Sequence, residues 1–157
     1  MRRGVRLGVD VGSVRIGLAR CDSSGLIASP LATVPRRPGD LATVAEIAAS
    51  SDAIEIIVGL AVGLAGREGK AAADCRAFAR ALAVQLPAVP VRLVDERFTT
   101  VLAHAALQQG GQDSRARRQS VDKAAAAMLL QGALDAERAT GQPAGQLVSA
   151  EGADSAQ

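Results

Sequence analysis

The sequence predicts an α/β domain in which a mixed five-stranded sheet carries helices packed on it. In the first third of the chain, three short runs of strand-forming residues are separated by turn residues, which is typical of an antiparallel meander. In the remainder, helical periodicity alternates with apolar runs, which is typical of strands covered by helices. We therefore expect three antiparallel strands followed by two parallel ones.

Apolar periodicity and turn residues place the individual elements. In the first run, Leu7, Val9 and Val11 alternate on one face, and a Gly-Ser turn follows. The expected strands cover residues 5–11, 15–21, 26–34, 54–60 and 91–96. The expected helices cover about residues 40–50, 70–85, 99–109 and 120–139.

Single residues refine these boundaries. Pro30 predicts an edge position or a bulge for the third strand, because proline cannot donate to a sheet ladder. Asp40 and Ser120 are expected to cap the first and last helices. Residues 1–140 are expected to form a single domain, whereas residues 141–157 are small, polar and aperiodic and are expected to be a disordered tail.

Composition limits the location and the kinds of site. No apolar run approaches the roughly 20 residues of a membrane span, and the N-terminal segment lacks the apolar stretch of a signal peptide. We therefore expect a cytoplasmic protein without a membrane partner. Cys21 and Cys75 lack metal-ligand spacing and are expected to be free thiols packed as small apolar groups. The single histidine, His104, argues against a histidine-based metal site or a Ser-His relay.

Basic residues are unevenly spread, although the formal net charge is only +2. Arginines cluster at Arg36 and Arg37 and in residues 110–119, a polar, glycine-containing segment expected to be a mobile loop. Arginine binds phosphate bidentately, so a nucleic-acid partner is permitted, but a high-GC coding bias would give the same composition. With two Phe and no Trp or Tyr, base stacking on aromatic side chains is not expected.

Asp10 is the unusual residue of the first strand. Aspartate is depleted from strands, and Asp10 is flanked on its face by Gly8 and Gly12, which have no side chain. A buried carboxylate must be paired, protonated or bound to a cation. The segment therefore leaves open whether Asp10 is bound to a cation or accepts hydrogen bonds at a turn.

Three further acids lie at the ends of expected elements. Asp95 and Glu96 end the fifth strand on opposite faces, and Asp122 lies on the apolar face of the last helix, near its expected start. Ligands collect at the carboxyl ends of strands in open α/β sheets, and oxygen ligands without histidine suit Mg²⁺ or Mn²⁺. Each acid also has a structural alternative, namely an ion pair with Arg92 or Arg97, or an interaction of Asp122 with the helix dipole.

Four segments resemble the motif blocks of the YqgF/RuvX family, in the same order and across nearly the whole folded region. They read DVGSVRIGLA, VGLAVGLAGREG, DERFTT and VDKAAAAMLLQ. The resemblance implies a ribonuclease H-like fold and a nuclease that matures the 5′ end of pre-16S ribosomal RNA or resolves Holliday junctions. Two residues depart from the family pattern: Ala61 stands where proline is usual, and Phe98 where leucine is usual.

The resemblance also implies a site. The family's acidic triad falls on Asp10, Glu96 and Asp122, which would bind Mg²⁺ or Mn²⁺ for two-metal hydrolysis of a phosphodiester bond, while Gly8 and Gly12 leave room for a phosphate. The expected nucleic-acid contacts are Arg15, Arg97, Arg115, Arg117 and Arg118.

Several alternatives stay open on the sequence. The substrate is either pre-ribosomal RNA, which we favour, or branched DNA, and the protein is a monomer or a homodimer. A non-catalytic module that binds nucleic acid or protein is a further possibility. The first motif also fits the phosphate-binding hairpin of sugar kinases and actin-like ATPases, but a second lobe and a second glycine-rich phosphate loop are missing.

Overall fold

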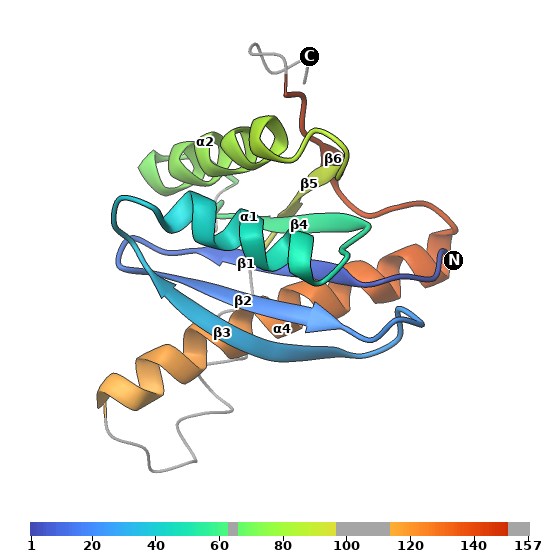
Figure 1. Ribbon diagram of the computed structural model, residues 1–157, viewed down its shortest axis with the longest axis horizontal. Helices are drawn as coiled ribbons and strands as arrows, with labels where there is room; N and C mark the ends of the chain where they lie inside the picture. Colours follow the sequence, from blue (N-terminus) through green and yellow to red (C-terminus); the bar gives the residue numbers. More distant parts are fainter. Residues whose placement is uncertain (63–65, 97–113, 151–157) are drawn as a thin grey trace.

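The computed structural model describes residues 1–62, 66–96 and 114–150 (Figure 1). The strands are β1 (Arg6–Val11), β2 (Arg15–Cys21), β3 (Ala28–Pro35), β4 (Glu55–Leu60), β5 (Val91–Asp95) and β6 (Gln146–Leu147). The helices are α1 (Asp40–Ser50), α2 (Lys70–Gln85) and α4 (Ser114–Thr140). In this described part of the chain, no helix combines the length and apolar character that crossing a membrane requires.

The strands form one mixed sheet in the order β3-β2-β1-β4-β5-β6. β1, β2 and β3 are antiparallel neighbours, whereas β4 runs parallel to both β1 and β5. This arrangement confirms the predicted mixed α/β class. The prediction for β3 is also confirmed, because it is an edge strand and its pairing with β2 shifts register beside Pro30.

The sheet has a sixth strand, β6, which the sequence did not predict. The prediction that the whole segment after residue 140 is disordered is therefore wrong at this strand. This short strand pairs antiparallel with β5, and the Val148 N–H donates to the Val91 carbonyl at 2.8 Å. The Arg92 guanidinium donates to the Ala144 carbonyl at 2.8 Å, and Gly145 adopts a positive φ where it lies against Leu93. Backbone hydrogen bonds hold this strand in place. Because such bonds do not depend on the type of side chain, they leave no periodic pattern in the sequence. Residues 151–157 lie outside the described residues.

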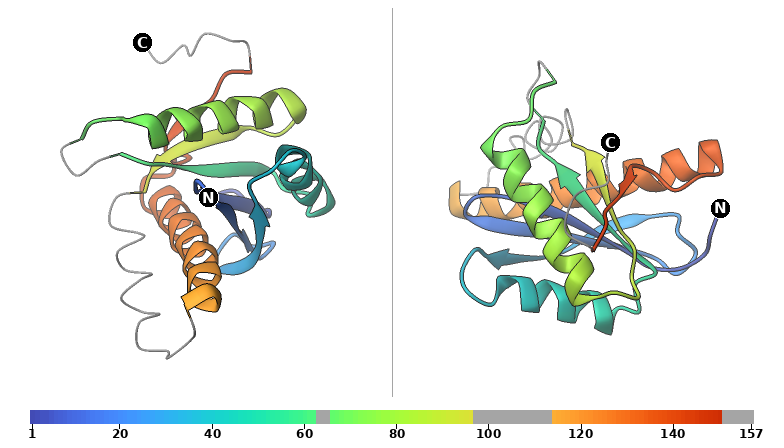
Figure 2. Two further views of the ribbon diagram at one scale, coloured as in Figure 1. Left: turned by 90° about the vertical axis from the view of Figure 1, so that its left-hand side faces the viewer. Right: turned by 90° about the horizontal axis from the view of Figure 1, so that it is seen from above.

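Helices cover both faces of the sheet (Figure 2). α1 and α2 pack on the face that presents Leu7, Val9 and Val11, which form the larger core. α4 packs on the opposite face, to which Gly8 and Asp10 belong by strand alternation. Asp10 therefore lies on the α4 face, at the carboxyl end of a central strand.

α4 begins six residues earlier than predicted. It starts at Ser114 and includes Ser120, which the sequence predicted as its cap. Residues 114–119 are mostly good helix formers, which favours this longer helix. Residues 114–119 are thus helical and not a mobile loop, while residues 97–113, including Arg97 and the predicted helix at 99–109, lie outside the described residues.

The first helix also starts differently from the prediction. Gly39 is the N-cap of α1 and makes no side-chain cap hydrogen bond. Asp40 is the first helical residue, and its carboxylate instead accepts a hydrogen bond from the Arg36 guanidinium at 3.0 Å. Because Arg36 also contacts α2, this interaction ties the loop before α1 to the neighbouring helix.

Two glycines let α4 approach the sheet closely. A Cβ on Gly17 would collide with the backbone carbonyl of Asp122, and one on Gly8 would lie 2.9 Å from the Cβ of Leu130. The expectation that Gly8 leaves room for a phosphate is therefore wrong, because α4 fills that space. Gly12 lies in the β1–β2 turn, where its N–H donates to the Arg15 carbonyl at 2.9 Å.

Candidate active site

Asp10 and Glu96 meet across the strand that separates them. Asp10 is near the end of β1 and Glu96 directly follows β5, with β4 lying between. The Glu96 carboxylate lies where a Cβ on Gly59 of β4 would be, and the Glu96 N–H donates to the Leu60 carbonyl at 3.2 Å. Gly59 therefore lets Glu96 reach across β4, and the two carboxyl groups are hydrogen bonded.

Burial makes these two carboxyl groups hold protons more tightly than ordinary acids. The pKa of Asp10 is raised by burial and by the charge of Asp122, although its hydrogen bond with Glu96 lowers it. The pKa of Glu96 is raised by burial first, and then by the charge and hydrogen bond of Asp10. Two partly buried carboxyl groups this close oppose each other's ionisation, so without a cation the pair favours retaining a proton.

Asp122 completes the acidic group but faces a different partner. It lies more than two turns into α4, so it does not interact with the helix N-terminus as the alternative interpretation required. Its carboxylate accepts a hydrogen bond from Arg15 Nε at 2.7 Å, and both side chains are about three-quarters buried. The negative charge of Asp122 still raises the pKa of Asp10.

The donor set suits a hard divalent cation. Asp10 and Glu96 offer partly buried carboxylate oxygens, and Asp122 would add another if it separated from Arg15. In the described part of the chain, no three His, Cys, Asp or Glu side chains are grouped closely enough to hold one ion. The chemistry of Asp10 and Glu96 therefore fits a divalent cation, whereas Asp122 could join them only by leaving its ion pair with Arg15.

The structure separates the neighbouring acids at the end of β5 as strand alternation predicted. Asp95 is exposed, whereas Glu96 is partly buried and reaches Asp10. If these acids hold a metal that acts in catalysis, we expect Glu96→Gln to lower Mg²⁺-dependent turnover at least about 100-fold, and Asp95→Asn to change it less than about threefold. Turnover of the two variants is compared with that of the unaltered protein in Mg²⁺. A larger loss for Asp95→Asn would reverse the assignment.

The basic residues predicted to contact nucleic acid are spread over more than one element. Arg15 opens β2 and pairs with Asp122. Arg115, Arg117 and Arg118 lie in the first turns of α4, and Arg118 is exposed. Because α4 also carries Asp122, these arginines and one acid of the group share a single element.

Both cysteines are free and buried, as the sequence predicted. Cys75 of α2 packs in the larger core, where the pKa of its thiol is raised to about 11, mainly by burial and also by the charges of Glu96 and Asp10. Cys21 accepts a hydrogen bond from the Arg6 N–H at 3.1 Å. The Cys75 thiol is therefore not poised to ionise near neutral pH.

Comparison with known proteins identifies the family of this chain. The sequence profile of the family described as "RuvX: Holliday junction resolvase" matches residues 4–136. The chain belongs to the RuvX family. The resemblance of the four sequence motifs is thereby confirmed over nearly the whole described region.

Curated relatives and solved structures extend this comparison. A protein from Nocardioides sp. is 52% identical over 94% of this chain and 98% of its own length, and one from Thermobifida fusca is also 52% identical over the same shares. Both relatives carry the name "Putative pre-16S rRNA nuclease". T. thermophilus RuvC in complex with Holliday junction substrate is 21% identical, with a TM-score of 0.56 over 90% of this RuvX chain and 99% of that chain. At this identity the likeness concerns the fold, and it supports the ribonuclease H-like class.

Proposed function

We propose that this RuvX protein is a metal-dependent endonuclease that hydrolyses phosphodiester bonds during 5′-end processing of pre-16S ribosomal RNA in the cytoplasm. The observation that carries the proposal is the partly buried, hydrogen-bonded pair of Asp10 and Glu96, which meet across β4 from the ends of β1 and β5. Acids whose ionisation is disfavoured by burial are typical of functional sites, and membership of a resolvase family gives these two acids such a function. The names of the curated relatives support the RNA substrate.

Asp10, Glu96 and Asp122 would hold Mg²⁺ or Mn²⁺. When bound, such ions activate a water molecule and neutralise charge that develops on the phosphate. The residues of the chain position these groups: Gly59 admits the Glu96 side chain, and Gly17 admits the α4 backbone that carries Asp122. Burial of Asp10 and Glu96 limits access of bulk water, which strengthens their interaction with any cation.

Arg15 has two proposed roles that exclude each other. With no metal bound it neutralises Asp122, and with metal bound it is released and donates to a substrate phosphate. Its position at the start of β2, beside the acids, supports this exchange. Arg97, Arg115, Arg117 and Arg118 are also proposed to contact the nucleic-acid backbone.

Arg15→Ala should therefore bind Mn²⁺ several-fold more tightly than the unaltered protein. The variant needs no energy to open the ion pair with Asp122, and about 1 kcal/mol corresponds to roughly fivefold in affinity. The same variant should bind RNA more weakly, because a phosphate donor is lost. Calorimetry measures the metal affinity and fluorescence anisotropy the RNA affinity.

Arg20→Ala is the matched control, because Arg20 lies exposed at the other end of β2. It should leave Mn²⁺ affinity unchanged. If Arg15→Ala binds Mn²⁺ no more tightly than this control, Arg15 does not compete with the metal for Asp122.

Resolution of branched DNA is the second candidate function. The family description names Holliday junction resolvases, which supports it. A resolvase would have to present two sites to one junction, so this function would require a homodimer, whereas RNA processing is compatible with a monomer. The two functions therefore differ in substrate and in the assembly they need.

A cleavage assay on two substrates tests the proposal. One substrate is an RNA that spans the 5′ leader and mature start of 16S ribosomal RNA, and the other is a four-way DNA junction. We expect Mg²⁺-dependent cleavage of the RNA at a higher rate than cleavage of the junction. Faster, paired cleavage of the junction would favour the second function, and no cleavage of either would indicate a non-catalytic module.

A further inference from the structure

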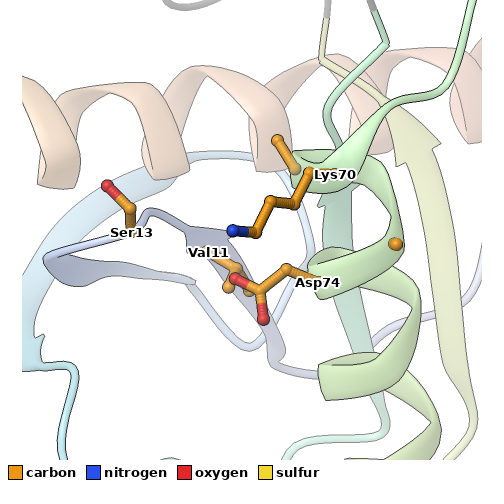
Figure 3. A pocket seen from close by; sticks show the side chains of 6 residues that line it. Val11, Ser13, Lys70 and Asp74 are labelled. Atoms are coloured by element: carbon orange, nitrogen blue, oxygen red, sulfur yellow. The ribbon is translucent and has the colours of Figure 1, made fainter.

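A pocket of about 690 Å³ lies beside the acids but on the other face of the sheet. It is lined by Val11, Ser13, Lys70, Ala71, Ala73 and Asp74, that is, by the end of β1, the turn after it and the first turns of α2 (Figure 3). Its volume is within the range of roughly 300–1,000 Å³ that is usual for small-molecule sites. The chain thus has room for one organic group directly next to the candidate active site.

Arg36 fixes the position of Asp74, one of the residues that line this pocket. Its Nη1 donates to the Gly12 carbonyl and to Asp74 Oδ2, both at 2.8 Å, and its Nη2 donates to Asp74 Oδ1 at 3.2 Å. The guanidinium therefore ties the β1–β2 turn to α2 and neutralises the carboxylate that lines the pocket. The shape of the pocket does not depend on a ligand.

The remaining charge in the pocket is positive. Figure 3 shows the Lys70 side chain extending from α2 toward Val11 and Ser13. Within the described residues, no carboxylate forms an ion pair with this ammonium group. Ser13 adds a hydroxyl group, while Val11, Ala71 and Ala73 supply apolar surface. An anionic group attached to a flat or apolar body would match all of these features.

The position of the pocket suggests which molecule carries this anionic group. Val11 directly follows Asp10, and successive side chains of a strand point to opposite faces about 3.3 Å apart along the chain. A nucleic-acid strand that passes over the end of β1 would therefore contact Asp10 on one face and the pocket on the other.

We infer that this pocket, with Lys70 at its rim, takes the nucleotide next to the phosphate that is cleaved. Lys70 and Ser13 contact its backbone phosphate, and the apolar floor contacts its sugar or base. The inference rests on the proposed nuclease function, but it is tested by binding, which requires no cleavage. Contact with a phosphate makes this part of recognition independent of base sequence.

The role of the Lys70 charge is tested by RNA binding. Fluorescence anisotropy of a labelled 12-nucleotide RNA from the pre-16S leader is measured in chelator over a series of salt concentrations. Lys70→Ala should bind about five- to tenfold more weakly, and its log–log salt slope should be smaller by about 0.7, as expected for one lost contact with single-stranded nucleic acid. Lys70→Arg should restore affinity to within about twofold. Arg3→Ala is the control, since Arg3 is exposed beyond the opposite end of β1.

A second variant tests the cavity without changing charge. Ala73→Phe should fill the pocket and weaken RNA binding several-fold, with the salt slope unchanged. Ala77→Phe, one turn further along α2 and also exposed, is its control. Unfolding temperatures of all variants, compared by circular dichroism, should agree with that of the unaltered protein.

Three outcomes would overturn the inference. They are equal affinity and slope for Lys70→Ala and the Arg3→Ala control, equal affinity for Ala73→Phe and Ala77→Phe, or binding of free 5′-AMP as tight as that of the RNA. The last would assign the pocket to a free nucleotide. A chain that cleaves nothing but shows the expected binding changes would overturn the proposed function and support the pocket, so the two failures are distinguishable.

Discussion

Asp10→Asn is expected to lower Mg²⁺-dependent cleavage at least about 100-fold while leaving the unfolding temperature in chelator equal or higher. Asparagine keeps the shape of aspartate and can donate its amide hydrogen to Glu96, but it binds a divalent cation poorly. The variant also removes a charge that raises the pKa of Glu96. One acidic group fewer then has to lose its hydration when the protein folds, so the folded state is not destabilised. Cleavage of the leader RNA and a thermal melt measure the two effects.

Asp52→Asn is the matched control for Asp10→Asn. Asp52 is exposed after α1 and has a positive φ, which asparagine tolerates. It should change neither cleavage nor stability. Turnover of Asp10→Asn close to that of the control would show that Asp10 does not hold the metal.

Glu137→Ala is expected to destabilise the fold by about 3 kcal/mol, which lowers the unfolding temperature by roughly 6–12 °C. Glu137 is 3% exposed and accepts hydrogen bonds from Arg2 Nη2 at 2.8 Å and from Arg6 Nη2 at 3.3 Å. Arg6 is 1% exposed, so its guanidinium would remain buried without a carboxylate. The loss is large because a buried charge is left uncompensated, and thermal and denaturant unfolding measure it.

Asp135→Ala, on the exposed side of the same helix, is the control for Glu137→Ala. Asp135 pairs with Arg138 at 3.0 Å, but its side chain is 57% exposed, so the expected loss is below about 0.5 kcal/mol. Equal melting temperatures for the two variants would contradict a structural role for the buried ion pair. The pKa of Glu137 is lowered to about 2 mainly by its hydrogen bond with Arg2, so its contribution should be lost as the pH falls from about 4.5 toward 2.

Strand geometry predicted that Asp10 would meet one of the two acids that end β5, and the resemblance to the RuvX family selected Glu96. Strand alternation assigns each acid to a face, and parallel strands bring their carboxyl ends to the same edge. What the sequence could not predict is the role of Gly59. A glycine inside a strand signals close approach, but the approaching group, Glu96, comes from a different strand, and its distance depends on the pairing of β4 with β5.

The surroundings of Asp122 were less predictable for a physical reason. Helix formers precede Ser120, and the last helix therefore extends back to Ser114, which removes Asp122 from the helix start. Its partner Arg15 is more than a hundred residues away in the sequence, and no local pattern indicates such an ion pair. Gly8 was misassigned for the same reason, because the helix that fills its space is also remote in sequence.

Calorimetric titration of Mn²⁺ tests most directly whether the acids form a metal site. The unaltered protein and Asp10→Asn are each titrated near pH 7 in two buffers of different ionisation enthalpy. Saturable binding accompanied by proton release is expected for the unaltered protein, because the proton shared by Asp10 and Glu96 must leave before both can bind a cation. Asp10→Asn should show neither the binding nor the proton release. No binding by the unaltered protein, or the same affinity and proton release in Asp10→Asn, would contradict the metal site.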